Sequence, residues 1–290
     1  MTLLVGTRTE APDDISANRT ILGRCTVKSM TNGSRELHRL LRTCRETAGF
    51  GLRSWMTSKM RDDDSRFDDV WSVADGVPGW FYETNAVAIF KVLAELRPLR
   101  IVEIGSYMGR STVFFGRSLQ ALGGKGRVTA IDPHTGDRQQ REGFGMSEIP
   151  SFDMFLTHLR LAGVEDLIDP IVATSSDAAR EWTEPFEFLF VDGWHGYEAV
   201  LADGREWVPK LSSGGVVVFD DALQYDEVRE AIAELDREGT IHLWGHFYGQ
   251  AYAGRTRVPP GAVQHVLNAG RIENFARKVE RSLHGSARPD

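Results

Sequence analysis

The most constraining feature of this sequence is a regular alternation of short apolar runs with helix-like segments between residues 100 and 237. Apolar runs typical of buried strands lie near 100–104, 127–131, 168–173, 186–191 and 215–219. Segments with the spacing of amphipathic helices lie near 110–122, 151–162, 175–182, 196–208 and 225–237. Because strands separated by helices pair in parallel and are covered on both faces, this order predicts a Rossmann-like, doubly wound α/β sheet.

The sheet is expected to continue beyond the last of these helices. Residues 241–247 and 251–258 contain aromatic and β-branched side chains and flank the sequence Tyr248-Gly249-Gln250. Two such runs around a glycine turn indicate an antiparallel hairpin. We therefore expect five parallel strands followed by a C-terminal antiparallel hairpin.

Three regions are expected along the chain. Residues 1–79 are interpreted as an N-terminal arm and helical extension, with a helix beginning near Ser34. Within this region the acidic run 61–69 lacks the glycine and the final glutamate of an EF-hand, and it is interpreted as a solvated linker. Residues 80–258 form the α/β domain, and residues 259–290 form a C-terminal helix that packs on the domain or on a second subunit.

The composition limits the classes of partner that this protein is expected to bind. The chain has 290 residues, 41% of them hydrophobic, which is enough for one large domain. A formal net charge of −7 disfavours nucleic-acid binding, which depends on clustered Lys and Arg. No apolar window approaches the length of a membrane span, no signal-peptide core is found, and Cys25 and Cys44 lack the spacing of metal ligands, so we expect a cytoplasmic protein.

Acidic residues follow two of the expected strands. Asp192 comes directly after the run 186–191, and Asp220 and Asp221 come directly after 215–219. Because parallel strands end side by side at one edge of a sheet, these carboxylates are expected to lie close together. Carboxylates repel one another unless a cation lies between them, and oxygen ligands suit Mg²⁺, Ca²⁺ or Mn²⁺. The alternative is that they cap the helices that follow.

A glycine turn follows the first expected strand. Gly105 and Gly109 can let the backbone approach a ligand at the start of the next helix, although tight turns also use glycine for packing. Their spacing differs from the Gly-x-Gly-x-x-Gly of dehydrogenases, and Glu103 would repel a pyrophosphate, which disfavours an NAD-dependent oxidoreductase. An acidic turn suits a cationic ligand such as S-adenosylmethionine.

Two further polar positions fit such a ligand. Asp132 ends the second strand, where its carboxylate can accept hydrogen bonds from both hydroxyl groups of a ribose or can cap a loop. The sequence Thr174-Ser175-Ser176-Asp177 follows the third strand, where it can meet an adenine edge or serve as a helix N-cap.

In these motifs the sequence resembles the class I S-adenosylmethionine-dependent, metal-dependent O-methyltransferases, which include catechol O-methyltransferase. The resemblance covers residues 80–258 and implies the seven-stranded methyltransferase fold. It implies that Asp192, Asp220 and Asp221 bind a divalent metal, most often Mg²⁺, although the family often has Asn at the last position. The implied cofactor-binding residues are Glu103, Gly105, Ser106, Tyr107, Gly109, Ser111, Asp132, Ser175, Ser176 and Asp192.

The segment from Asp192 to Asp203 is similar to a bacterial branch that methylates sugars and other natural-product hydroxyl groups. In that branch the residue matching His195 is the proposed general base, and an ordinary histidine pKa near 6.5 suits this role. Two alternatives remain for His195, a structural hydrogen bond and a fourth metal ligand. The implied function is methyl transfer from S-adenosylmethionine to a hydroxyl group of a small molecule or glycoside.

Other interpretations remain open. The same fold can serve as a non-catalytic binding module, and the same carboxylates can serve a hydroxylase-like or hydrolytic metalloenzyme. The N-terminal arm and the last helix also suggest a homo-oligomer. Aromatic and histidine side chains expected near the rim can shape an acceptor pocket, although most should pack in the core or hairpin; they are Trp80, Phe81, Tyr82, Trp194, Tyr197, Trp244, His246 and Tyr248.

Overall fold

The computed structural model describes residues 64–136 and 149–271, which all fall within one compact unit, Gly49–Asp290. Several predictions lie outside the described residues. They concern Cys25, Cys44, the helix beginning near Ser34, and the part of the last helix from Ile272 onward.

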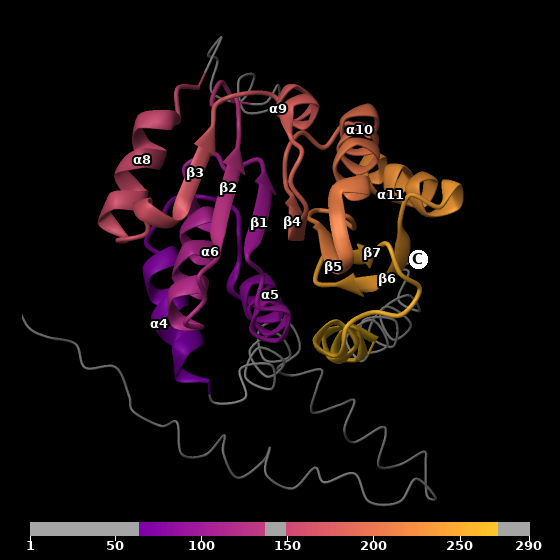
Figure 1. Ribbon diagram of the computed structural model, residues 1–290, viewed down its shortest axis with the longest axis horizontal. Coiled ribbons are helices and arrows are strands. Elements are labelled where there is room, and N and C mark those ends of the chain that lie inside the picture. The colour runs from indigo at the N-terminus through magenta and orange to yellow at the C-terminus, as the bar shows by residue number, and fades with distance from the viewer. Residues whose placement is uncertain (1–63, 137–148, 272–290) are drawn as a thin grey trace, which may run out of the picture. The chain divides into compact units, whose positions relative to one another are not determined.

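A single seven-stranded sheet forms the centre of the described structure, as the sequence predicted (Figure 1). Its strand order is β3-β2-β1-β4-β5-β7-β6. The first five strands pair in parallel, β7 runs antiparallel to β5, and β6 runs antiparallel to β7. The strands are β1 (Arg100–Ile104), β2 (Arg127–Ile131), β3 (Ile168–Ile171), β4 (Phe186–Val191), β5 (Leu211–Phe219), β6 (His242–Phe247) and β7 (Gln250–Gly254).

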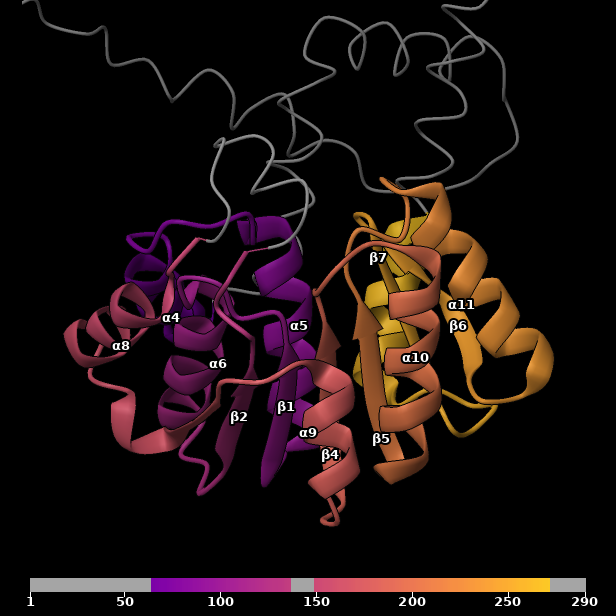
Figure 2. The same cartoon turned by 90° about the horizontal axis from the view of Figure 1, so that it is seen from above.

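Helices cover both faces of this sheet, and each face has its own apolar core (Figure 2). The helices are α4 (Ser65–Ala74), α5 (Glu83–Leu96), α6 (Arg110–Ala121), α8 (Phe152–Leu161), α9 (Ser175–Glu181), α10 (Tyr197–Trp207) and α11 (Asp226–Glu238), with short 3₁₀ turns at Glu165–Leu167 and Val208–Lys210. One core contains residues of α4, α5, α6 and α8, and the other contains residues of α9, α10 and α11. Consecutive strand residues alternate between them: Val216 and Val218 face the first core, and Val217 and Phe219 face the second.

The acidic run before the domain is not a linker over its described part. Asp64 is the N-cap of α4, and its side chain accepts a hydrogen bond from the backbone N–H of Arg66. Phe67, Val70 and Ala74 are buried in the core that α4 shares with α5 and α6. The aspartates therefore begin an amphipathic helix, and the expected boundary between residues 79 and 80 divides one core.

The C-terminal part of the sheet differs slightly from the prediction. β5 begins at Leu211 instead of residue 215, and β7 ends at Gly254 instead of residue 258. The hairpin turn is where it was expected: Tyr248 and Gly249 both have positive φ, 45° and 89°, as a tight hairpin turn requires. A helix then begins at residue 261 and continues to the end of the described range at 271.

Candidate functional site

A cavity of about 1070 Å³ opens at the carboxyl ends of β1, β2 and β4. Most of the residues predicted to bind a cofactor, a metal or a proton line it. They are Gly105, Ser106, Tyr107, Ser111, Asp132, Ser175, Asp192, His195 and Asp221. The topology explains this convergence, because parallel strands end at one edge of the sheet and the strand order reverses between β1 and β4, where a crevice forms.

Four of the predicted site residues do not line the cavity. Glu103 and Asp220 are buried, Gly109 packs against the ring of Phe155, and Ser176 lies on α9 outside the lining. Each of the four lies at a strand end or helix start, as predicted. The sequence could not show in which direction the side chains of Glu103, Asp220 and Ser176 point.

The glycine turn brings two strand ends into close contact. Gly105 has a φ of 88°, and a Cβ atom built on it would lie 2.1 Å from the backbone oxygen of Asp192. Its N–H donates to the carbonyl of Ile131 at 2.9 Å. Gly105 therefore has two requirements that no other residue meets: a left-handed backbone, and no side chain where the loop after β4 passes.

Glu103 lies beneath this turn. It is fully buried, and its Oε2 accepts a hydrogen bond from Thr112 Oγ1 at 2.5 Å. Burial raises the pKa of Glu103 to about 8, and hydrogen bonds from Ser111 and Thr112 oppose the rise. Glu103 Oε1 is buried without a hydrogen-bond partner. Glu103 thus lies behind the cavity wall, where its hydrogen bond with Thr112 links β1 to the start of α6. Its role in cofactor binding stays a prediction.

Asp132 combines both interpretations that the sequence left open. Its Oδ2 accepts a hydrogen bond from the Tyr107 N–H at 2.8 Å, and its Oδ1 accepts one from the His134 N–H at 2.6 Å. These bonds fix the loops after β1 and β2. The same carboxylate lines the cavity, where it has lone pairs left for further hydrogen bonds.

The loop after β3 also has a structural role. Thr174 is the N-cap of α9, because its side chain accepts a hydrogen bond from the Asp177 N–H at 3.1 Å. Ser175 nevertheless lines the cavity. Thr174 lines the cavity as well, so the N-cap residue and its neighbour both contribute to the cavity wall.

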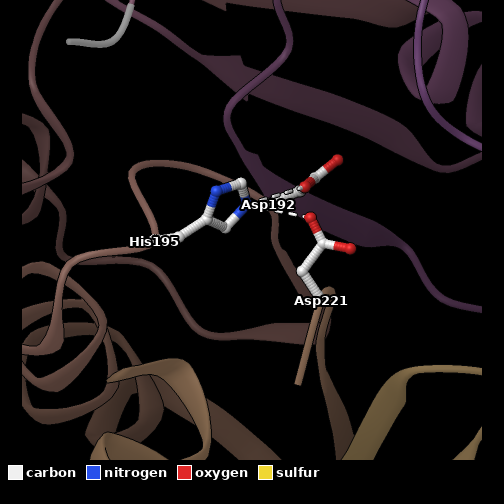
Figure 3. Close-up of side chains that lie close together, drawn as sticks. All are labelled: Asp192, His195 and Asp221. Carbon is white, nitrogen blue, oxygen red and sulfur yellow. Dashed lines mark ion pairs between the residues drawn. The ribbon is translucent and has the colours of Figure 1, made fainter. Parts of the chain in front are cut away.

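Asp192, His195 and Asp221 lie together on one side of the cavity, and the imidazole of His195 points toward both carboxylates (Figure 3). His195 Nε2 lies 3.1 Å from Asp221 Oδ2 and 3.9 Å from Asp192 Oδ1. One donor atom from each residue lies within 4.8 Å of the others. Neither ring nitrogen of His195 has a hydrogen bond of good geometry, so the 3.1 Å contact is an ion pair whose angles are poor.

The charged groups of this cluster change one another's pKa. Burial alone would lower the pKa of His195, but Asp192 and Asp221 outweigh it and raise that pKa to about 10. Burial raises the pKa of Asp192 to about 6, and His195 opposes the rise. In the metal-free protein the two carboxylates thus favour the protonated form of His195, so the ordinary histidine pKa assumed from the sequence does not apply.

Asp220 does not join this cluster, which corrects the predicted set of three carboxylates. Among the described residues, the group that could hold a metal is Asp192, His195 and Asp221. Asp220 is 7% exposed, and its Oδ1 accepts hydrogen bonds from Asn85 Nδ2 at 3.4 Å and from the Asp221 N–H at 3.0 Å. Burial raises its pKa well above the usual value. The left-handed backbone of Asp221 changes the direction of the chain directly after Asp220, and of the two residues Asp221 lines the cavity.

Asp221 has a left-handed backbone with a φ of 54°. Asp and Asn tolerate this conformation better than most other residues. The geometry gives a physical reason why Asp or Asn suits this position.

Aromatic side chains occupy part of the cavity wall. Trp80, Phe81, Tyr82 and Trp194 line it as expected, whereas Tyr197, Trp244, His246 and Tyr248 do not. Trp80 stacks on Tyr107 with ring centroids 5.4 Å apart.

Several residues that line the cavity were not predicted to belong to the site. Those with polar or charged side chains include Arg110, Asp203, Gln224 and Tyr225. Tyr225 was the easiest to find, because it follows Asp221 within the same strand-to-helix loop. Arg110 donates to the Gly79 carbonyl at 2.9 Å and forms an ion pair with Asp75, which fixes the segment that carries Trp80.

The sequence is also similar to known proteins. Residues 102–222 match the family model described as a methyltransferase domain. A segment of 143 residues is 36% identical to the uncharacterized protein y4gI of Sinorhizobium fredii (strain NBRC 101917 / NGR234). That match spans 47% of this chain and only 14% of the relative.

The fold is also similar to solved structures. The O-methyltransferase NovP matches with a TM-score of 0.51 and 18% identity, over 59% of this chain and 81% of NovP. The O-methyltransferase from Bacillus cereus, solved in complex with SAH, matches with a TM-score of 0.48 and 16% identity, over 70% of this chain and 94% of that one. At 18% identity the likeness to NovP shows a shared fold. Within the described ranges, no helix is long and apolar enough to cross a membrane.

Proposed function

We propose that this protein transfers a methyl group from S-adenosylmethionine to a hydroxyl group of a small molecule or glycoside. The observation that carries the proposal is that one cavity holds both parts of the predicted site. The glycine turn and Asp132 lie on its wall, and so does the cluster of Asp192, His195 and Asp221. The match of residues 102–222 to a methyltransferase domain supports the same reaction class.

The cavity wall has the groups that such a cofactor needs. The turn from Gly105 to Tyr107 lines the cavity near the start of α6. It contributes backbone polar groups and the side chain of Ser106 to the cavity wall. The carboxylates of Asp132 and Asp192 provide negative charge for a ligand that carries an ammonium and a sulfonium group. Asp132 has lone pairs left for ribose hydroxyl groups after it accepts its two backbone hydrogen bonds.

The reaction is a direct displacement. The acceptor oxygen forms a bond to the methyl carbon, the bond from that carbon to sulfur breaks, and S-adenosylhomocysteine leaves with the electron pair. The hydroxyl proton must leave during this step, and His195 is the residue that we propose accepts it. Its Nε2 faces Asp192 and Asp221, and the ring is held at the cavity wall with 19% of the side chain exposed and both ring nitrogens buried.

The cluster also fits a hard divalent cation. Two carboxylates and an imidazole converge within 4.8 Å, and both nitrogens of His195 are buried without a hydrogen bond. We propose Asp192 and Asp221 as ligands, with His195 as a third ligand or as the base. A bound Mg²⁺ would acidify the acceptor hydroxyl group and offset the carboxylate charge that keeps His195 protonated.

The aromatic residues of the cavity wall favour a methyl acceptor that has flat apolar faces and hydroxyl groups at its edges. Trp80 and Tyr82 are 57% and 60% exposed, and Trp194 is 39% exposed, although all three line the cavity. Exposed aromatic rings beside a polar cluster can stack on a sugar ring or a phenol.

Calorimetry provides the test of this function. Purified protein is titrated with S-adenosylmethionine and with NAD⁺, each with Mg²⁺ and with EDTA. We expect S-adenosylmethionine to bind in both conditions and NAD⁺ to bind in neither, because the glycine turn lacks the dehydrogenase spacing. Binding of NAD⁺ without binding of S-adenosylmethionine would contradict the proposal.

A further inference from the structure

A network of buried polar side chains lies directly behind the proposed metal cluster. Its members come from three places in the fold: Asn85 from α5, Asp220 from the residue that follows β5, and Gln250 and Tyr252 from β7. All four are buried, and Gln250 and Tyr252 are completely so. The proposed reaction gives Gln250 and Tyr252 no role. Buried polar groups cost more than apolar side chains that fill the same space, so the network indicates a role beyond packing.

Tyr252 determines which side of the Gln250 amide faces Asp220. The Tyr252 hydroxyl donates to Gln250 Oε1 at 2.9 Å. A carboxamide has one acceptor atom and one donor atom, so a donor at Oε1 leaves Nε2 for the opposite side. β5 and β7 pair in antiparallel fashion with Phe219 opposite Ala251, which brings the next residue on each strand side, Asp220 and Gln250, beside each other.

The Asp220 carboxylate has amide groups from two elements as partners. Burial raises the pKa of Asp220 well above its usual value, and a hydrogen bond from the Gln250 side chain opposes the rise. Gln250 Nε2 has no hydrogen bond of good geometry, so this contact is close but poorly aligned. Asn85 Nδ2 donates to Asp220 Oδ1 at 3.4 Å. Side chains of β7 and α5 thus both contact this carboxylate.

The Asp220 carboxylate in turn holds the backbone of Asp221. Its Oδ1 accepts the Asp221 N–H at 3.0 Å. Asp221 has a φ of 54°, a left-handed conformation that costs energy in a residue with a side chain. From this conformation its Oδ2 lies 3.1 Å from His195 Nε2. The place of Asp221 in the cluster therefore depends on a hydrogen bond that the buried network supports.

We propose that Gln250, oriented by Tyr252, is a positioning residue for metal binding, because it holds Asp220 so that Asp221 keeps its place in the cluster. This inference rests on the proposed function, in which Asp192 and Asp221 bind a divalent metal. Hydrogen-bond partners behind a metal ligand set its orientation, and their loss weakens metal binding by about ten- to a hundredfold.

The test measures the affinity for Mn²⁺ and for S-adenosylhomocysteine by calorimetry, and stability by urea unfolding. Gln250→Met removes the amide at nearly constant length, Tyr252→Phe removes only the hydroxyl group, and a third protein combines both changes. Ser118→Ala is the control, because it removes a fully buried hydroxyl group of α6 that belongs neither to the network nor to the cavity wall.

We expect Gln250→Met to weaken Mn²⁺ binding by about tenfold or more, and Tyr252→Phe to weaken it by about threefold or more. The double variant should bind Mn²⁺ as weakly as Gln250→Met does, because Tyr252 acts through Gln250 and the two losses are then not additive. Affinity for S-adenosylhomocysteine should stay close to that of the wild type in every variant. Ser118→Ala should keep its affinity for Mn²⁺, whatever stability it loses.

Unchanged Mn²⁺ affinity in folded Gln250→Met and Tyr252→Phe, or an equal loss in Ser118→Ala, would overturn the inference while the proposed function stands. Losses that multiply in the double variant would also overturn it, since Tyr252 would then not act through Gln250. If Gln250→Met does not fold, Tyr252→Phe decides the inference alone. A wild type that binds S-adenosylhomocysteine but no Mn²⁺ would remove the metal from the proposed function, and this inference with it.

Discussion

The imidazole of His195 stacks on the ring of Tyr225, with ring centroids 4.3 Å apart and planes inclined by 9°. Tyr225 is the N-cap residue of α11, and His195 lies in the loop before α10. The stack therefore links the loops after β4 and β5. It restricts rotation of the imidazole, so that Nε2 stays beside the carboxylates of Asp192 and Asp221.

The stack predicts that Tyr225 acts by positioning His195. Tyr225→Phe keeps the ring and should retain turnover within about threefold, whereas Tyr225→Ala should lower kcat by about tenfold or more, because a misplaced base loses much of its effect. Affinity for S-adenosylhomocysteine, measured by calorimetry, should change little in both variants. Equal loss of turnover in Tyr225→Phe and Tyr225→Ala would show that the stacked ring is not the important feature.

His195 itself should matter for turnover more than for cofactor binding. His195→Ala removes the proposed proton acceptor, and we expect kcat to fall by about a hundredfold. The dissociation constant for S-adenosylmethionine should stay near that of the wild type. Steady-state kinetics and calorimetry on the same preparation check both expectations, and unchanged turnover would remove the assignment of His195 as the base.

Gly105→Ala should destabilise the protein more than its backbone conformation alone explains. Gly214 offers a matched control, because its φ of 81° is close to the 88° of Gly105 but a Cβ atom there meets nothing within 4 Å. The left-handed conformation should cost roughly 1–2 kcal/mol in each variant. In Gly105→Ala the overlap with the Asp192 carbonyl should cost about 1–3 kcal/mol more. Urea unfolding measures both free energies, and equal losses would mean that the loop can move away.

Glu103 should make stability depend on pH. Burial raises its folded-state pKa from 4.5 to about 8, so its contribution to stability is complete below pH 4.5 and is lost as the pH rises through 8. In this range the contribution to the free energy of unfolding should fall by roughly 1 kcal/mol per pH unit. Glu103→Gln cannot ionise, so its stability should fall less than that of the wild type between pH 5.5 and 8. Parallel pH profiles would contradict the raised pKa.

The sequence predicted the sheet well because its strands and helices have clear periods. The five parallel strands and the hairpin follow from apolar runs and from the turn at Tyr248 and Gly249. Helix α4 was missed because its first turn is acidic, and charge alone does not distinguish a capped amphipathic helix from a solvated linker. Its buried Phe67 and Val70, three residues apart, were the signal that could have revealed it.

The candidate site was harder to predict, because its assembly depends on side-chain direction. Asp220 and Asp221 are adjacent residues of a turn in which Asp221 has a left-handed backbone, and Asp221 lines the cavity whereas Asp220 is buried. Residues 215–219 of β5 are all buried, so the pattern along the strand does not indicate which of the two aspartates faces the cavity. The raised pKa of His195 could not be predicted, since it depends on the close approach of two carboxylates from different strand ends.

The most direct test of the central claim is transfer of a labelled methyl group from S-adenosylmethionine to a panel of sugars and phenols, followed by mass spectrometry. We expect a product that gains one methyl group, activity that EDTA abolishes and Mg²⁺ restores, and no activity in Asp192→Ala or Asp221→Ala, although both variants still bind S-adenosylhomocysteine. Methyl transfer that proceeds equally in EDTA and in both variants would contradict the role of this cluster. Binding of the cofactor without transfer to any hydroxyl acceptor would contradict the proposed reaction.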